Sequence, residues 1–299
     1  MNPFNTPILF LIFNRPDTTE KVFEKIRELK PKNLYIAADG PRNEGEIIKC
    51  NVVKNIVLNN IDWDCNLKTL FREKNLGCKY AVSSAIDWFF DNVEEGIILE
   101  DDCLPHSSFF DFSTLMLNLY RDNPKIMHIS GDNFSNIEIN ESYFFSKYAH
   151  IWGWATWKRA WNYYDVDIPD WPNKKLSLLS TVFKKSKTQQ TYWRKIFDSV
   201  YNNQVNTWDY QWNYACFKQN GLAITPKVNL ISNIGFTNNA THISKNTPFA
   251  DLQTYNLEQP YINPKSKSLN IKNDEWIAKR FFKNNPLLIR IINKFKFIR

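Results

Sequence analysis

The stretch of residues 96–110, GIILEDDCLPHSSFF, decides the fold, because it joins a strand to a run of charge and then to a helix. The apolar residues after Gly96 have the character of a buried strand. Glu100, Asp101 and Asp102 follow directly, and an aromatic-rich amphipathic segment comes next. Three adjacent carboxylates repel one another, so they stay ionised only when a cation or hydrogen-bond donors compensate them. The stretch therefore indicates a binding site at the end of a buried strand.

The first half of the chain alternates strand-like and helix-like segments. Segments suited to strands lie at residues 7–13, 33–38, 67–71 and 96–99, and the first of them is a continuous apolar run. Helical patterns lie between them, at residues 16–29, 44–58 and 80–90. Asp17 and Glu20 have the spacing of a capping box at the start of the first helix. Apolar strands that are separated by helices predict an α/β fold, with a Rossmann-like, mainly parallel sheet and helices on both faces.

Two common nucleotide-binding motifs are missing from this pattern. The first strand is followed by Asn14, Arg15 and Pro16 instead of a glycine-rich turn, and no Walker lysine loop occurs. The chain becomes richer in Trp, Tyr and Asn after about residue 125. We expect one domain with the halves 1–125 and 126–250, then a linker over 251–273 and a basic amphipathic helical segment over 274–299.

The excess positive charge lies at the end of the chain. The formal net charge is +7, and residues 276–299 contain seven basic residues and no acidic ones, so the rest of the chain is balanced. A neutral body argues against nucleic acid as a partner. In residues 274–299 the basic side chains interleave with aromatic and aliphatic ones. This pattern predicts peripheral membrane contact, and the alternative is a helix that docks on the body with a solvated basic face.

The cysteine pattern and the beginning of the sequence indicate a cytoplasmic protein. Five scattered cysteines without a CxxC pair predict reduced thiols, with neither a disulfide framework nor a zinc site. The first residues lack a basic region and a small-residue cleavage site, and no apolar run approaches the roughly 20 residues that span a bilayer. With the basic segment, we expect a peripheral location on the inner face of the cytoplasmic membrane.

Polar residues follow each of the predicted strands. In open α/β sheets, ligands bind beyond the carboxyl ends of the strands, so these groups are expected to face one crevice. They are Arg15, Asp39, Arg72 and the carboxylates of residues 100–102. Carboxylates suit Mg²⁺ or Mn²⁺, which take further ligands from phosphates and water. Zn²⁺ would require His or Cys at a usable spacing, which Cys103 and His106 do not have. The expected ligand is a metal-bound diphosphate.

These residues resemble a known family. The segment LEDDCLPHSSFFDF resembles the Asp-x-Asp motif of GT-A glycosyltransferases, most closely in the animal N-acetylglucosaminyltransferase I family, and related bacterial nucleotide-diphospho-sugar transferases are similar too. Four further blocks resemble that family in the same order, over roughly residues 5–245. They are PILFLIFNRPDTTEKVFEKI, YIAADG, HIWGWATWKRAW and TWDYQWNYACFKQNGLAITPKVNLISNIGF. The resemblance implies a GT-A fold with a nucleotide-sugar-binding first half and an aromatic-rich acceptor half.

The resemblance also implies roles for individual residues. Arg15 and Asp39 would hold the nucleotide of a UDP-sugar, and Asp101 would lie near the ribose. Asp102 would bind the metal, and Glu100 would lie close to the donor sugar.

In the second half, the resemblance makes Asp209 the catalytic base of an inverting transfer. Trp152, Gly153 and Trp154 would shape the sugar and acceptor pocket, and His242 would belong to a loop that closes over the diphosphate. The loop around His242 departs from the animal family in detail. The structural alternative for Asp209 is a local cap between aromatic residues.

The sequence therefore favours a metal-dependent glycosyltransferase that moves a sugar, such as GlcNAc or a related hexose, from a UDP-sugar to a glycan or lipid-linked acceptor in bacterial surface polysaccharide synthesis. Two alternatives stay open. A sugar-nucleotide pyrophosphorylase shares the nucleotide-binding half, although FNRPDTTEK lacks the glycine-rich first loop expected of one. A binding protein without catalytic activity is the other.

Overall fold

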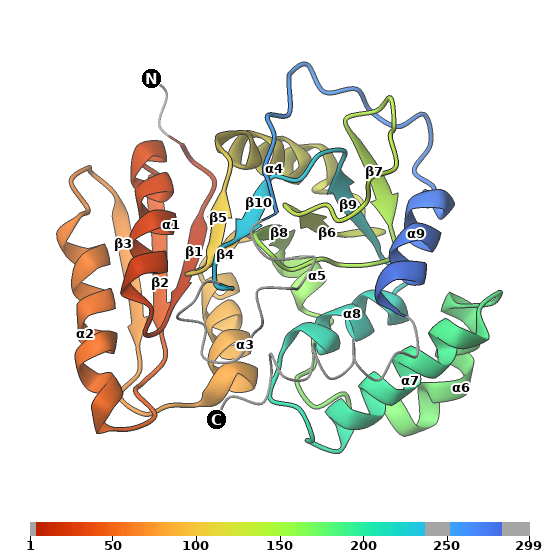
Figure 1. Cartoon of the computed structure of the whole chain (residues 1–299), viewed down its shortest axis with the longest axis horizontal. Coiled ribbons are helices and arrows are strands. Elements are labelled where there is room, and N and C mark those ends of the chain that lie inside the picture. Colours follow the sequence, from red (N-terminus) through yellow and green to blue (C-terminus); the bar gives the residue numbers. More distant parts are fainter. Residues whose placement is uncertain (1–3, 237–251, 283–299) are drawn as a thin grey trace.

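A large mixed sheet with helices on both faces organises the chain (Figure 1). The computed structural model describes residues 4–236 and 252–282. Within these ranges eight strands form one sheet, in the order β3-β2-β1-β4-β8-β6-β9-β7, and β10 pairs with β5 in a second, two-stranded sheet. The predicted α/β fold class is confirmed.

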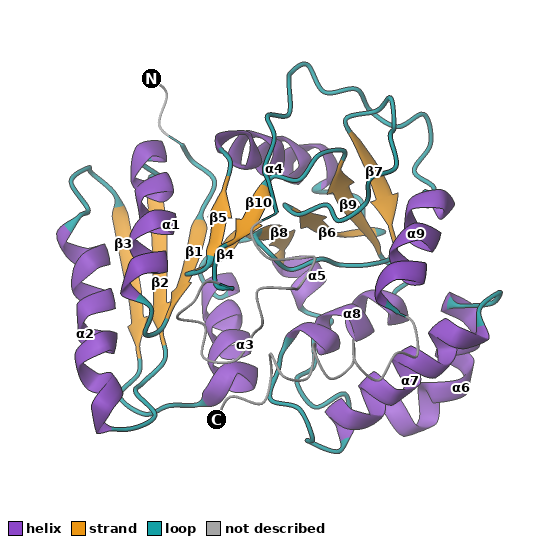
Figure 2. Ribbon diagram, viewed as in Figure 1, coloured by secondary structure: helices purple, strands orange, loops and turns teal. Residues whose placement is uncertain are grey.

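The strands and helices have the following bounds (Figure 2). The strands are β1 Ile8–Ile12, β2 Asn33–Ala38, β3 Asn66–Phe71, β4 Glu95–Glu100, β5 Cys103–Pro105, β6 Ile126–Ser130, β7 Tyr143–Ser146, β8 Trp154–Trp157, β9 Leu222–Pro226 and β10 Ile231–Asn233. The helices are α1 Pro16–Leu29, α2 Glu44–Asn59, α3 Gly77–Phe90, α4 Ser107–Tyr120, α5 Lys158–Trp161, α6 Trp171–Val182, α7 Lys187–Tyr201, α8 Asp209–Lys218 and α9 Ile271–Phe281.

Most strands of the large sheet run in one direction. The pairs β3-β2, β2-β1 and β1-β4 are parallel. Strand β8 is antiparallel to both β4 and β6, so β6 runs in the same direction as β4. Strand β9 is parallel to β6, and β7 closes the sheet in the opposite sense. The carboxyl ends of β1, β2, β3, β4 and β6 therefore lie at one edge of the sheet.

Alternate residues of β1 pack into two different cores. Ile8 and Phe10 belong to a cluster with α1, α2 and α4, whereas Leu9 and Leu11 face α3, α5 and α8. This follows from the two-residue repeat of a strand, whose side chains point to opposite faces. A third core lies among α6, α7, α8 and α9. The helical group of α6 to α8 lies beside the sheet, below α9 in the view of Figure 1.

The start of α1 differs from its predicted capping box. Arg15 is the N-cap, Pro16 occupies the first turn, and no side chain caps the helix. Proline lacks the N–H that a cap would satisfy, and its fixed φ suits the first helical position. The helix therefore begins before Asp17, which lies within the first turn.

The pattern around Trp157 and Trp161 also has a different structural basis. The i,i+4 spacing predicts one helix with both rings facing the core. Both side chains are buried, but Trp157 ends β8 and Trp161 ends α5. A strand followed by a single helical turn thus produces the same spacing.

The segment expected as a linker lies along the body. Among residues 252–270, the N–H of Leu257 donates to Ser108 Oγ at 3.2 Å and that of Ile262 donates to Ser142 Oγ at 2.9 Å. The following helix α9 buries Ile277 and Ala278, whereas Lys279 and Arg280 are exposed. Up to residue 282 the chain therefore forms a docked helix with a solvated basic face.

The described part of the chain contains no helix with the length and apolar character that crossing a membrane requires. The rest of the basic segment, residues 283–299, lies outside the described residues. Its predicted membrane contact stays a prediction.

Candidate active site

A cavity of about 1560 Å³ lies at the carboxyl edge of the parallel strands. Its first wall comes from residues after β1, β2, β3 and β4, and its second wall from α7, α8, α9 and the loops after β6 and before β8. The cavity therefore lies where a ligand site is expected in an open α/β sheet. It joins the predicted strand-end residues to the second half of the chain.

The three consecutive carboxylates line this cavity, and Arg15 lies over them. Arg15 Nη1 donates to Asp102 Oδ2 at 2.5 Å and lies 3.5 Å from Asp101 Oδ1. Asp101 Oδ2 also accepts the Phe13 N–H at 3.1 Å. The Glu100 Oε1 atom is buried and has no hydrogen-bond partner among the described residues. Compensation of the carboxylates by a cation is thus observed, and it comes from the loop after β1.

The compensation is incomplete. Burial, and then the charges of Asp102 and Asp101, raise the pKa of Glu100 to about 8. Burial raises the pKa of Asp101 to about 6, against the opposing charge of Arg15. Burial and the neighbouring carboxylates thus disfavour the charged form of Glu100. A further cation in the cavity would favour the charged form.

The carboxylates fit a hard divalent ion only in a particular way. The described residues contain no group of three His, Cys, Asp or Glu side chains arranged to hold a metal. Mg²⁺ and Mn²⁺ sites that use one or two carboxylates and draw their other ligands from phosphates and water do not need such a group. Asp102 is suited to this role, and the unpartnered Glu100 Oε1 atom lies in the same cluster. The guanidinium of Arg15 competes for Asp102 Oδ2.

Asp39 and Arg72 both line the cavity, each held by a neighbouring loop or helix. The Asp39 carboxylate accepts the N–H groups of Gly40 and Leu76 at 2.9 Å and that of Gly77 at 3.1 Å. Arg72 Nη2 donates to Ser84 Oγ at 2.8 Å. Asp39 therefore ties the end of β2 to the start of α3, in addition to any contact that it makes with a ligand.

Asp209 lies on the opposite wall, in the first turn of α8. Its charge is one of the smaller contributions that raise the pKa of Glu100, so the two carboxyl groups interact across the cavity. Thr207 Oγ1 donates a hydrogen bond to Asp209 Oδ1. The structure thus brings the predicted base and the predicted donor-binding carboxylates together.

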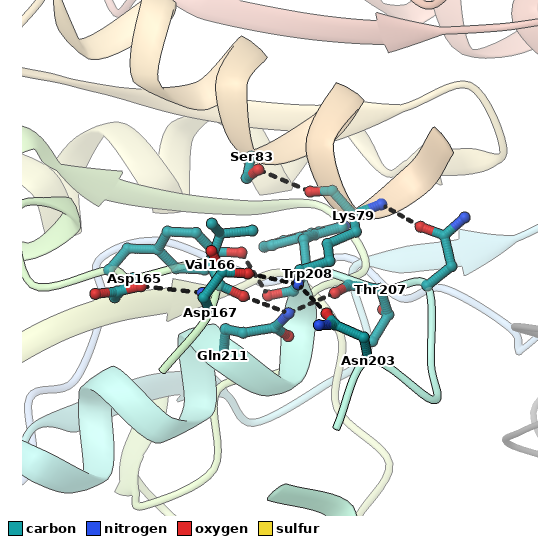
Figure 3. Close-up of polar contacts among 11 residues, drawn as sticks. Lys79, Ser83, Asp165, Val166, Asp167, Asn203, Thr207, Trp208 and Gln211 are labelled. Atoms are coloured by element: carbon teal, nitrogen blue, oxygen red, sulfur yellow. Dashed lines mark hydrogen bonds and ion pairs between the residues drawn. The ribbon is translucent and has the colours of Figure 1, made fainter. Parts of the chain in front are cut away.

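The loop before Asp209 is fixed by residues from both halves of the chain (Figure 3). Lys79 Nζ, from α3, donates to Asn203 Oδ1 at 2.8 Å and to Asp167 Oδ1 at 2.7 Å. Gln211 Nε2, from α8, donates to Thr207 O at 2.7 Å and to Val166 O at 3.2 Å. Because Lys79 is buried, its ion pair and hydrogen bonds hold this loop against the first half of the chain.

The three residues of the Trp-Gly-Trp segment lie in different surroundings. Trp152 lines the cavity, with its ring 5.1 Å from that of Phe134. Gly153 has a φ of +61° and would place a Cβ against Ile231, so it supports the turn. Trp154 is fully buried and stacks on Trp208 at 5.5 Å. We therefore correct the expectation for Trp154, whose ring lies in the core and does not line the cavity. His242 lies outside the described residues.

Sequence reasoning missed three acidic residues that line the cavity, Asp17, Glu46 and Asp132, of which Asp132 is the buried one. Asp132 follows β6, whose carboxyl end lies at the same edge as those of β1 and β4. The segment IMHISGD resembles the ends of β2 (YIAAD) and β4 (IILEDD), because a carboxylate closely follows the strand. The strand-end rule would have found Asp132 if it had been applied beyond residue 125.

No protein-family model matches the chain, and no curated protein sequence matches it. Several solved structures are similar in fold. A cytidylyltransferase from Leptospira borgpetersenii has 14% sequence identity and a TM-score of 0.36, with 61% of this chain and 72% of that chain covered. A UDP-glucose pyrophosphorylase in complex with UDP-glucose has 9% identity and a TM-score of 0.37, over 75% and 90% of the two chains. The galactosyltransferase LgtC, in complex with donor and acceptor sugar analogs, has 10% identity and a TM-score of 0.36, over 71% and 70%. Similarities this distant do not distinguish one activity from another.

Proposed function

We propose that this chain is a metal-dependent, inverting glycosyltransferase that transfers a sugar from a UDP-sugar to a glycan or lipid-linked acceptor. One observation carries the proposal: a single cavity contains the Arg15 and carboxylate cluster on one wall and Asp209 on the other. A sugar transfer of this type needs a site for a diphosphate leaving group and a carboxylate that accepts a proton from the acceptor. The two walls supply groups suited to these two tasks.

The first wall is assigned to the donor. Asp39 and Arg72 contact the nucleotide, and Asp101 lies near the ribose. Arg15 binds the diphosphate, whose charge draws the guanidinium away from Asp102, and Asp102 is the residue that would hold the divalent ion. When bound, the ion supplies positive charge that stabilises the departing diphosphate. Glu100 lies close to the donor sugar, and its Oε1 atom, which has no hydrogen-bond partner among the described residues, is available to a sugar hydroxyl.

The second wall is assigned to the acceptor. Asp209 takes the proton from an acceptor hydroxyl as its oxygen attacks the anomeric carbon. The new carbon–oxygen bond forms on the face opposite the leaving group, the old bond to the diphosphate breaks, and its electron pair leaves with UDP. The configuration at the anomeric carbon is therefore inverted. Trp152 offers a ring face to the C–H groups of a sugar.

The physiological role that we propose is a step in bacterial surface polysaccharide synthesis, with GlcNAc or a related hexose as the transferred sugar. The acceptor would be held at the inner face of the cytoplasmic membrane, where residues 274–299 contribute peripheral contact. Exposed Lys279 and Arg280 on α9 support this orientation, because they continue the basic character of the segment.

Melting temperatures with UDP, UDP-GlcNAc, UDP-glucose and UDP-galactose, with and without Mn²⁺, test the donor site. A ligand that binds the native state raises its stability, so we expect a metal-dependent rise with UDP-sugars. The absence of any shift with these ligands would contradict the proposal. Formation of UDP-sugar from UTP and a sugar phosphate would instead support a pyrophosphorylase.

Two variants test the assigned roles, with exposed Asp122→Asn as the control. Asp102→Ala should abolish the metal-dependent shift and turnover. Asp209→Asn should keep the shift and lower donor turnover by about 10²- to 10⁴-fold, which is the usual contribution of a general base. A binding protein would show no turnover in the wild type and would be affected only by Asp102→Ala. Turnover that is unchanged in Asp209→Asn would refute the assignment of the base.

A further inference from the structure

Asp132 is a buried acid in the cavity wall without a structural task. It is fully buried, and neither carboxylate oxygen has a hydrogen-bond partner among the described residues. The N–H groups of Asp132 itself and of Trp152 lie close enough to lower its pKa slightly, but burial dominates and raises that pKa well above the usual value. Buried polar groups are almost always hydrogen-bonded, so an unpartnered one in a cavity wall points to a ligand.

The backbone on both sides of Asp132 is held firmly. The Gly131 N–H donates to Gly153 O at 2.7 Å, and the Asn133 N–H donates to Asn229 Oδ1 at 3.1 Å. Asn133 Nδ2 also donates to Pro226 O at 2.8 Å. These contacts fix the backbone from which the Asp132 side chain extends. Such rigidity is what a binding group requires for selectivity.

A second unpartnered polar atom lines the same wall. The Nε2 atom of His150 is buried and has no hydrogen-bond partner within the described ranges. Its backbone is anchored to the end of β6, because the His150 N–H donates to Ser130 Oγ at 3.3 Å. Burial lowers the pKa of His150 to about 4, so the ring is neutral at pH 7 and suited to an uncharged hydroxyl.

Aromatic rings complete this part of the cavity. The Phe134 ring lies 4.9 Å from the ring of His150 and 5.1 Å from that of Trp152. Trp152 in turn lies 5.6 Å from Phe236. Aromatic faces beside a carboxyl group and an imidazole match the two surfaces of a pyranose, its C–H groups and its hydroxyl groups.

We propose that Asp132 and His150 form a subsite that binds hydroxyl groups of a pyranose packed against Trp152. This inference rests on the proposed function and adds a specificity-determining acid, at the end of β6, to the residues assigned above. The pyranose is either the sugar of the donor or that of the acceptor, which share this chemistry. The Asp132 carboxyl can engage two neighbouring hydroxyls at once, because each of its oxygens is unpartnered.

Two substitutions at Asp132 test the subsite, with Glu138→Gln, an exposed acid on the same loop, as the control. Asp132→Asn keeps the shape, and Asp132→Leu removes all hydrogen bonding. Neither should lower the melting temperature, because a buried acid without partners does not stabilise the fold.

In the donor test, calorimetry with Mn²⁺ measures Kd for UDP and for UDP-GlcNAc, UDP-glucose and UDP-galactose. In the acceptor test, saturation-transfer NMR measures the binding of methyl glycosides of the same three sugars with UDP and Mn²⁺ present.

The subsite is supported if sugar recognition falls while UDP affinity and the melting temperature are kept. The ratio of the Kd of UDP to the Kd of a UDP-sugar measures how much the sugar contributes to binding. A roughly 10- to 100-fold fall in this ratio identifies the donor sugar as the ligand. A loss confined to the methyl glycosides identifies the acceptor.

The inference is overturned if both measurements are unchanged in the Asp132 variants, or if UDP affinity and melting temperature fall together. A wild-type protein that binds no nucleotide refutes the proposed function. In that case the binding of the methyl glycosides is the remaining test of the subsite, and the inference is overturned if they do not bind.

Discussion

The Arg15 guanidinium occupies Asp102 Oδ2, the oxygen that a divalent ion would need in the proposed site. The guanidinium is about half exposed, with a side-chain exposure of 52%, whereas the Asp102 side chain is only 14% exposed. Replacing Arg15 by Gln removes a cation from a cluster of buried acids. Allowing for solvent screening of the exposed guanidinium, we expect a loss of about 1 kcal/mol in the free energy of unfolding in metal-free buffer.

The same substitution should increase the response to metal. With Arg15→Gln, Mn²⁺ alone should raise the melting temperature more than it does in the wild type, because no guanidinium occupies Asp102 Oδ2. Arg27→Gln is the control, since Arg27 pairs with Asp62 on the surface of α1, away from the cavity. An equal Mn²⁺ response in all three proteins would show that Asp102 is not the metal ligand.

His128 should make the fold sensitive to acid. Trp212 Nε1–H donates to His128 Nδ1 at 3.1 Å, and His128 Nε2–H donates to His150 O at 2.6 Å, so both nitrogens are engaged with the ring neutral. Burial lowers the pKa of His128 to about 3. Between that value and the unfolded pKa of about 6.5, the unfolded chain binds the extra proton, so stability is present above pH 6.5 and falls as the pH drops.

The size of this effect can be measured against a variant without the ring. Between pH 7 and pH 5 the wild type should lose about 2 kcal/mol more unfolding free energy than His128→Gln, because of the linkage of one proton. Urea unfolding at both pH values gives the difference, and raised carboxyl pKa values elsewhere cancel because both proteins share them. If the difference in unfolding free energy between the wild type and His128→Gln is the same at both pH values, His128 is not a neutral, buried ring in the folded protein.

For single residues, the sequence predicts where a residue lies in the fold better than it predicts where its side chain points. The residues after β1 to β4 could be placed at one edge because strand ends are visible in the hydropathy pattern. Trp154 could not be separated from Trp152, because β8 begins at Trp154 and the turn at Gly153, with its positive φ, separates the directions of the two rings. The anchoring of Asp39 by the start of α3 depends on the loop between β3 and α3, which has no short-range signal.

The contact between the end of β6 and the start of β8 depends on two glycines. A Cβ on Gly131 would lie 2.5 Å from Gly153 O, and the Gly131 N–H donates to that same oxygen. Gly131→Ala should therefore force the two backbones apart and cost about 1–3 kcal/mol, as overpacking generally does. Chemical denaturation measures the loss, and the displacement should also weaken any ligand binding at Trp152.

Gly45→Ala is the opposite case and serves as the control. Gly45 lies in the first turn of α2, and its Cβ would meet only Asn43 Oδ1 at 3.3 Å. Alanine is the better helix former, so we expect a gain of about 0.5–1 kcal/mol. If both substitutions shift stability in the same direction, the close approach at Gly131 is not what determines its cost.

The strands and helices of the first half were predictable from the sequence, because short strand-like segments alternate with longer segments that have a helical apolar stripe. The apolar side of α2 was less predictable. Ile47, Ile48 and Val52 belong to the predicted stripe but are exposed, whereas Cys50, Val53 and Val57 are buried. Apolar residues occur all round this helix, so periodicity alone does not define its inner face. The strands after residue 125 have only three to five residues and could not be recognised one by one.

Lys79 joins the two halves of the molecule. Besides its side-chain contacts with Asn203 and Asp167, its backbone N–H donates to Asn206 Oδ1 at 2.9 Å. Lys79→Met should remove the side-chain hydrogen bonds at a cost of about 1–3 kcal/mol and loosen the loop before Asp209. Hydrogen exchange should then be faster at residues 202–208. Lys25→Met, which breaks an exposed pair with Glu28, should leave that exchange unchanged.

The contacts between the two halves of the chain could not be predicted from local sequence patterns. Lys79 and Asn203 are far apart in the sequence, and nothing in either segment identifies the other as its partner. A resemblance to a known family placed Asp209 opposite the carboxylates, whereas hydropathy and spacing did not. The fold class was therefore predictable from physics, and the composition of the second wall was not.

The packing of Trp154, Trp161, Trp208 and Trp212 has an optical consequence. Five of the ring pairs among them have centroids between 5.2 and 6.4 Å apart, in the core on the α3 side of the sheet. Indoles at such separations exchange excitation energy and couple electronically, so this cluster should dominate the near-ultraviolet circular dichroism. That signal reports on the intactness of the core. The fluorescence of Trp152 and Trp193, which line the cavity, reports on its occupancy. One protein thus carries separate spectroscopic reporters for folding and for ligand binding, without any added label.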